Sequence, residues 1–307
     1  MIKYFTLLLI GSLLIVPCAH ATGQAGTDIA ILNAGVGARA LGMGSAFTAV
    51  ADDVTASVWN PAGLSLVTSY EITTMQTKLS TDANHYYLAY ANPLWGGTLG
   101  ISWIQVGMGD LSQTSSEVDS HNEVQNLSVF SYFSNAYLLS YGRKINDHIS
   151  FGLTGKYLAS DMQVTGGQGY GYSITPGILF TINQLKIGAK VDELFNEQKW
   201  GTGMVERTPA KLRIGVAVAM RERGKIALDM SQTIRSGYDA VISAGYEWMR
   251  QGLALRLGYN NGVTAGAGFT ANLQEGKAGS VQLDYAYVTQ DALSRSNVHR
   301  VSLGGAW

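Results

Sequence analysis

The chain has 307 residues and a formal net charge of −1; only 14% of its residues are charged, while 46% are hydrophobic and 10% aromatic. A disordered chain would carry more charge and fewer aromatic residues, and a nucleic-acid-binding protein would carry a net positive field, so the composition excludes both classes. With 37 glycines and only 5 prolines, it favours strands that alternate apolar and polar residues, as in a membrane β-barrel.

The N-terminus has the three parts of an export signal. Lys3 supplies a positive start, residues 7–16 form an apolar core, and Ala19-His20-Ala21 is an A-x-A cleavage site. We therefore predict that residues 1–21 are a signal peptide, cleaved after Ala21. A membrane anchor is the alternative, but the apolar stretch is too short to cross a bilayer as a helix.

Cys18 is the only cysteine, and it lies in the predicted signal peptide. A lipoprotein signal would use this residue, but Pro17 directly before it fits such a signal poorly. Without Cys18 the mature chain has no disulfide, no thiol nucleophile and no thiolate metal site.

The next segment, residues 22–68, is rich in Ala and Gly and lacks long alternation. Its run Gly35-Val36-Gly37-Ala38-Arg39-Ala40 matches the relaxed dinucleotide fingerprint, but the acidic residues come too early and no βαβ pattern follows. Small residues let backbones pack closely. We therefore interpret residues 22–68 as a compact plug inside a barrel lumen.

From residue 69 onward, stretches of about ten alternating residues are separated by turns or loops. The pattern predicts an all-β fold, a transmembrane antiparallel barrel over residues 69–307 with about fourteen strands. An even number returns the chain to its starting side. The strands are expected at 69–79, 84–93, 97–106, 128–142, 148–160, 169–182, 185–193, 209–220, 224–234, 239–249, 252–261, 263–272, 279–290 and 298–307.

The connections alternate in length. With both termini in the periplasm, the longer loops 107–127, 161–168 and 194–208 lie outside, as is typical of outer-membrane barrels. We therefore expect the mature chain in the cell outer membrane, with its apolar strand faces against outer-membrane lipid.

Several charged residues fall on the strand faces that carry small residues, so they are expected to point into the lumen. Charged groups buried there must form ion pairs or remain hydrated. A structural network that holds the plug is one interpretation, and a selectivity filter is the other, although nearly balanced signs cancel the field of an ion-selective pore. These residues are Lys156, Lys190, Asp192, Arg213, Asp229, Glu247, Arg256, Asp284 and Arg300.

Pro176 and Gly177 lie in the middle of the expected strand 169–182. Proline cannot donate a ladder hydrogen bond and belongs on edges or bulges. We expect a bulge or kink at this site, which makes it a candidate lateral gate. A bulge that only sets the curvature of the barrel is the alternative.

No pattern of catalytic residues is found. The mature histidines His85, His121, His148 and His299 are scattered, without the spacing of a zinc site. No nucleophile elbow or phosphate-binding loop occurs. We therefore predict a protein that is not an enzyme and that has no metal, no cofactor and no nucleic-acid partner.

The chain ends with Val301, Leu303, Gly305 and Trp307 on one strand face. This ending resembles the C-terminal assembly signal of bacterial outer-membrane barrels, which implies recognition by the barrel-assembly machinery. The alternative is an ordinary last strand that ends in Trp307.

The run from Gly37 to Asp53, followed by Trp59-Asn60-Pro61-Ala62-Gly63-Leu64, resembles the N-terminal region of the PorV/PorQ family of outer-membrane proteins. That family is similar to the FadL-type long-chain fatty-acid transporter barrels. The resemblance implies a 14-stranded barrel with an N-terminal hatch in the lumen, carried by Gly37, Arg39, Gly42, Gly44, Asp52, Asp53, Trp59, Asn60, Pro61 and Gly63.

Two functions are compatible with this resemblance. A FadL-like barrel passes small hydrophobic compounds across the outer membrane of a Gram-negative cell. A PorV-like barrel is a non-transporting scaffold for protein secretion or surface attachment, which would bind secretion-system proteins through loops 107–127 and 194–208.

Local chemistry suggests structural roles for the motif residues. Pro61 has a fixed φ and pushes Asn60 toward extended geometry, from which Asn60 can close an Asx turn. Gly63 can take a positive φ. Asp52 and Asp53 are expected to cap a short helix or to meet lumen cations, and Trp59 to pack against the barrel wall.

Overall fold

The computed structural model describes residues 30–79, 83–118, 124–163, 166–220, 223–235, 237–274, 277–289 and 297–307. The predicted signal peptide, residues 1–21, and the start of the predicted plug, residues 22–29, lie outside the described residues. Within these ranges, no helix is long and apolar enough to cross a membrane.

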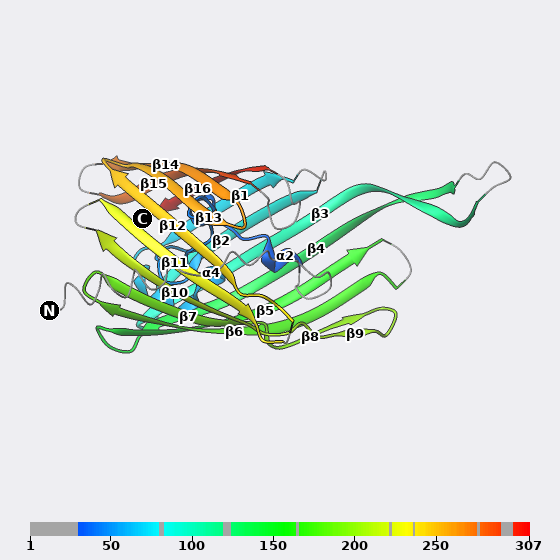
Figure 1. Cartoon of the computed structure of the whole chain (residues 1–307), viewed down its shortest axis with the longest axis horizontal. Coiled ribbons are helices and arrows are strands. Elements are labelled where there is room, and N and C mark those ends of the chain that lie inside the picture. Colours follow the sequence, from blue (N-terminus) through cyan, green and yellow to red (C-terminus); the bar gives the residue numbers. More distant parts are fainter. Residues whose placement is uncertain are drawn as a thin grey trace.

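Fourteen antiparallel strands close into a barrel (Figure 1), which confirms the predicted all-β fold. They are β1 Glu71–Lys78, β2 Asn84–Leu94, β3 Gly97–Val118, β4 Val124–Lys144, β5 Ile149–Met162, β6 Gln168–Ile182, β7 Leu185–Asp192, β10 Lys211–Met220, β11 Gly224–Thr233, β12 Val241–Arg250, β13 Leu253–Asn260, β14 Val263–Gln274, β15 Lys277–Val288 and β16 Val298–Ala306. The ring closes between the first and last strands, where Glu71 lies opposite Ala306.

The β3–β4 hairpin extends far beyond the other strands (Figure 1). β3 continues to Val118 and β4 begins at Val124, so the prediction of a loop over 107–127 is wrong. This stretch is rich in Ser, Thr and Gln, and its two strands pair with several register shifts and without apolar alternation. We call the end of the barrel with this hairpin the hairpin end, and the opposite end the turn end.

The predicted loop 194–208 also contains strands. β8 Leu194–Trp200 and β9 Val205–Glu206 form a short hairpin. β8 pairs with β6, on the side of β6 that also pairs with β7. The extra hairpin therefore continues the edge of the wall toward the hairpin end.

The two faces of each strand have the character that the alternation predicts. On β10, Ile214 and Val216 are exposed, whereas Gly215 and Ala217, which alternate with them, are buried. A soluble sandwich would bury the large apolar side chains instead. Exposed apolar and buried small residues are the arrangement of a barrel that faces lipid.

Residues 30–68, which we call the N-terminal segment, are enclosed by the strands (Figure 1). The segment forms three short helices, α2 Ala30–Asn33, α3 Ala38–Gly42 and α4 Ala56–Trp59, and the 3-10 helix η1 Pro61–Leu66. η1 contacts β3 to β6, and α3 contacts β13 to β16. The segment therefore touches the wall on both sides of the lumen.

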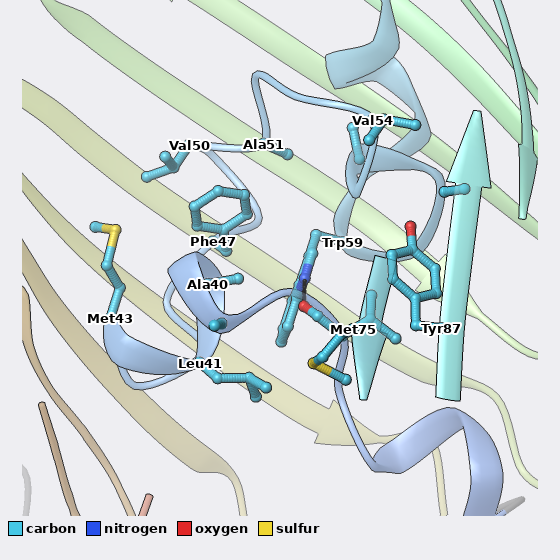
Figure 2. Packing of buried hydrophobic residues seen from close by; sticks show 14 of the residues in the cluster. Ala40, Leu41, Met43, Phe47, Val50, Ala51, Val54, Trp59, Met75 and Tyr87 are labelled. Atoms are coloured by element: carbon cyan, nitrogen blue, oxygen red, sulfur yellow. Dashed lines mark hydrogen bonds between the residues drawn. The ribbon is translucent and has the colours of Figure 1, made fainter. Parts of the chain in front are cut away.

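A buried apolar cluster joins the N-terminal segment to the wall (Figure 2). Phe47 and Trp59 pack edge to face, with their ring centroids 6.1 Å apart. Met75 and Tyr87 reach the cluster from β1 and β2. Trp59 also donates from Nε1 to the carbonyl of Val36 at 2.9 Å, so the polar edge of this indole is bound within the segment itself.

Candidate functional site

Inward-facing glycines allow the N-terminal segment to lie directly against the wall. Gly142, Gly152 and Gly177, on β4, β5 and β6, face the Asn60-Pro61 turn, and a Cβ atom at any of the three would collide with this turn. The absence of a side chain is what permits this approach. The same close approach joins Gly42 to Gly266 of β14 and Gly44 to Gly258 of β13, and it joins Thr48 to Gly188 of β7 and Gly215 of β10.

Asn60 fastens this turn to β6. Its φ of −167° is extended, as Pro61 requires, and its side-chain oxygen accepts from the amide of Ala62 at 3.2 Å, which closes an Asx turn. Its side-chain amide donates to the carbonyls of Thr48 at 2.8 Å and Ile178 at 3.2 Å. Asn60 is fully buried, so the same side chain joins two parts of the segment and the wall.

Gly63 does not adopt the positive φ that glycine allows. Gly63 lies within η1, and a Cβ there would collide with the carbonyl of Ala51. Glycine is required at this position by close approach. Positive φ values occur instead at Gly37, with 78°, and at Gly44, with 63°.

Arg39 joins the N-terminal segment to the wall at the turn end. Its guanidinium donates to Asp52 at 2.7 Å and to Asp53 at 2.9 Å. It also forms a bidentate ion pair with Glu247 of β12, with two hydrogen bonds of 2.9 Å each. Burial alone would raise the pKa of the Asp52 carboxyl, but Arg39 and Lys225 hold that pKa well below its usual range.

The ion pairs continue along the wall. Arg256 donates to Glu247 at 2.7 Å and to Asp284 at 2.6 Å, and Lys225 contacts Asp52 at 2.8 Å. Each cation of the group thus meets at least two carboxylates. We call this group the turn-end network: Arg39, Asp52, Asp53, Lys225, Glu247, Arg256 and Asp284.

A cavity of about 550 Å³ lies beside the turn-end network. It is lined by the residues of the network except Glu247, and by residues of the turn end, 250–254 and 304–306. Charged and hydroxyl side chains make up about half of this lining. The cavity is therefore suited to water and polar groups, because an apolar ligand would remove the hydration of these charged groups.

On its β5 side, β6 shows no bulge at Pro176. The β5–β6 register runs unbroken, with Leu153 opposite Pro176 and Gly152 opposite Gly177. The predicted bulge is therefore absent on this side. Gly177 is needed because it faces Asn60, and not because the strand needs flexibility there.

On its other side, β6 changes partner. Pairing with β7 begins at Gly177 and pairing with β8 ends at Ile174, so within the described residues Thr175 and Pro176 have no strand partner on this side. Proline removes one ladder donor, and Glu193, with a φ of 60°, turns the chain out of β7. We call this interruption the β6–β7 gap.

Four buried charges lie at the β6–β7 gap. Lys156 of β5 contacts Glu193 at 2.6 Å, and Lys190 of β7 contacts Asp192 at 2.8 Å. Lys190 also donates to the carbonyl of Val58 in the N-terminal segment at 2.7 Å. We call Lys156, Lys190, Asp192 and Glu193 the gap cluster.

A small chamber of about 80 Å³ adjoins the gap cluster. Arg213 lines it and lies over the Trp59 ring, 5.7 Å from the ring centroid. In the part of the chain that the structure describes, the buried Nε of Arg213 has no hydrogen-bond partner. The indole face supplies an electrostatic contact for this cation.

The two other lumen charges of the sequence prediction lie apart from both groups. Asp229 accepts from the amides of Phe47 at 3.1 Å and Thr48 at 2.9 Å. Arg300, which is fully buried, contacts His85 at 2.8 Å. The predicted lumen charges are thus all inside the barrel, but they belong to separate groups.

Sequence reasoning missed two charged residues of these groups, Lys225 and Glu193. Lys225 lies four residues before Asp229 on the same strand face, so strand parity carries a signal for it. Glu193 follows the end of β7, and its left-handed backbone breaks the alternation. No parity rule identifies a residue placed in this way.

Trp307 lies where the barrel closes at the turn end. Its ring stacks on Tyr70 with 6.1 Å between the ring centroids, and the two backbones exchange hydrogen bonds of 3.0 and 3.1 Å. The role of Trp307 as an assembly signal stays a prediction.

No family model and no curated protein sequence matches the chain. Solved structures do match it. The toluene transporter TodX of Pseudomonas putida is 14% identical, with a TM-score of 0.60 over 89% of this chain and 97% of that chain. The CymD monoaromatic hydrocarbon channel is 11% identical, with a TM-score of 0.61 over 89% and 97%. A FadL homologue of Pseudomonas aeruginosa is 10% identical, with a TM-score of 0.52 over 86% and 96%.

These similarities show the barrel fold. All three proteins resemble this chain over nearly their whole length, although few residues are identical. By their names they are a toluene transporter, a monoaromatic hydrocarbon channel and a FadL homologue, and none is named as an enzyme.

Proposed function

We propose that this protein is an outer-membrane barrel for passive transport of small hydrophobic compounds. The observation that carries the proposal is the β6–β7 gap, which lies beside an internal chamber. The strand pairs on either side of it, β5–β6 and β7–β10, are hydrogen-bonded without a register shift. The names of TodX and CymD, a toluene transporter and a monoaromatic hydrocarbon channel, agree with such a route.

The N-terminal segment has the position of a hatch in this proposal. It contributes Trp59 to the chamber, and Arg39 to the cavity at the turn end. A compound that enters at the hairpin end would therefore meet the segment before it reached the polar cavity. A sideways exit through the β6–β7 gap would lead it to the apolar outer surface.

Uptake of radiolabelled toluene tests the transport proposal. Gram-negative cells whose outer membrane carries the protein are compared with the same cells without it. We expect faster uptake with the protein, and equal uptake would contradict the proposal.

Pro176→Val tests the sideways route. Valine restores a backbone donor and favours strand geometry, so we expect the gap to narrow and uptake to fall. Pro93→Val, at the turn end of β2, is the matched control and should keep full uptake. Gly177 is unsuitable for this test, because a side chain there would collide with Asn60.

A PorV-like scaffold is the second candidate function, and the long β3–β4 hairpin favours it (Figure 1). This hairpin and the β8–β9 hairpin give a partner two extended surfaces beyond the barrel. Replacing residues 109–131 by a short Asn-Gly turn should abolish co-purification with secretion-system proteins and leave toluene uptake unchanged. Loss of uptake with no change in co-purification would speak against the scaffold.

The remaining assignments complete the proposal. Residues 1–21 would direct export and be removed after Ala21, residues 22–68 would form the hatch, and residues 69–307 the barrel. The last strand with Trp307 would be recognised by the barrel-assembly machinery. Mass spectrometry of the purified protein tests the cleavage site.

A further inference from the structure

The gap cluster lies where the wall lacks backbone pairing. β7 continues past Lys190 to Asp192 and still pairs with β10 there, but on its other side it has left β6. Leu194 pairs with Ile174 of β6 again, so Asp192 and Glu193 lie in a short interruption between two ladders and are joined to β5 and β6 by side chains.

Side-chain contacts cross the gap in place of the ladder. Thr175 of β6 approaches Asp192 at 3.5 Å. Lys156, one strand further along, reaches past β6 to Glu193 at 2.6 Å and to Asp192 at 3.8 Å. β5 and β6 are thus both joined to the end of β7.

Lys190 also reaches into the lumen. The same ammonium group that contacts Asp192 at 2.8 Å donates to the carbonyl of Val58 at 2.7 Å. Val58 lies in α4, directly before the Trp59-Asn60-Pro61 turn. One buried side chain therefore contacts both the edge of the gap and the N-terminal segment.

The burial of the cluster makes these contacts strong. The exposed fractions are 8% for Lys156, 5% for Lys190, 9% for Asp192 and 7% for Glu193. Two positive and two negative charges compensate each other. Removing one partner from such a group leaves a buried charge uncompensated, which is strongly unfavourable.

We propose that Lys190 is a positioning residue that couples the N-terminal segment to the β6–β7 gap, so that the gap widens only when the segment moves. This inference rests on the proposed transport function, because it names what would regulate the sideways route. The N-terminal segment then does more than fill the lumen, since its position sets the state of the wall beside it.

Hydrogen exchange of the full-length protein in detergent tests the coupling without any transport measurement. Lys190→Met removes both contacts and keeps the length of the side chain. We expect amide exchange to become about tenfold faster or more at two places together, residues 174–177 and residues 55–60. Faster exchange at only one of them would overturn the proposal.

Lys225→Met is the matched control. Lys225 also contacts the N-terminal segment, through Asp52, but it lies on β11, away from the gap. Exchange should rise near Asp52 and stay unchanged at residues 174–177. Faster exchange at the gap in this variant as well would mean that any loosening of the segment opens the gap, and Lys190 would lose its special role.

Lys190→Arg gives a second variant that keeps the charge, in case Lys190→Met does not fold. Lys190→Arg should retain near-normal amide exchange at both places. Lys190→Gln removes the charge, and faster exchange at both places in this variant but not in Lys190→Arg would support the charged contact. Toluene uptake separates the two proposals. Coupled exchange without protein-dependent uptake refutes the transport function alone, whereas uptake without coupled exchange refutes the role of Lys190 alone.

Discussion

The turn-end network and the gap cluster are built from the same kinds of ion pair, but the wall behind them differs. Behind the turn-end network, β12 and β13 pair continuously from Ser243 to Arg250. Behind the gap cluster, β6 has no partner at Thr175 and Pro176 within the described residues. Ion pairs of the first group therefore add to a wall that the backbone already closes, whereas those of the second group stand in for the missing backbone bonds.

The comparison shows that charge chemistry alone does not assign a role. Both groups are at least partly buried, both contact the N-terminal segment, and both contain lysine or arginine between carboxylates. The state of the hydrogen-bonded ladder decides whether breaking them loosens only the segment or also the wall. This difference can be tested by disturbing each region separately.

Arg39→Met is expected to have the largest effect on stability. It leaves Asp52, Asp53 and the buried Glu247 without this cation, which costs about 3–5 kcal/mol of the free energy of unfolding. Denaturant unfolding of the purified protein measures the loss, with Arg143→Met, at an exposed position on β4, as control. Exchange at residues 174–177 should stay normal, and faster exchange there would remove the distinction between the two regions.

Gly177→Ala is expected to have an intermediate effect, next to the gap. The added Cβ would meet the Asn60 side chain and the Pro61 ring, and overpacking of this kind costs about 1–3 kcal/mol. Gly155→Ala on β5 is the control, because the nearest atom to its Cβ is 4.0 Å away. If both variants unfold at the same denaturant concentration, the N-terminal segment is not tightly packed against the wall at Gly177.

Lys225→Met is expected to have the smallest effect. Its side chain is 23% exposed, so water screens its contact with Asp52, and we expect a loss of about 1 kcal/mol or less. The same denaturant series measures it. A loss as large as that of Arg39→Met would show that the network depends on all its cations equally.

The sequence by itself determined the architecture of the barrel. Alternation with a period of two makes one face of each strand apolar, and this local property identified the fourteen strands and the inward side of Lys156, Arg256 and Asp284. The Asn60-Pro61 turn could also be predicted from local rules, since proline restricts the residue before it.

Only the tertiary structure decided how these pieces meet. The close approach of Gly152 and Gly177 to the Asn60-Pro61 turn joins residues about ninety or more positions apart, and no local pattern records such a distance. The extended β3–β4 hairpin depends on backbone pairing, which polar side chains do not reveal. The gap at Pro176 lies on only one side of β6 because β7 turns away at Glu193. The path of β7, and not the sequence of β6, therefore decides on which side β6 lacks a partner.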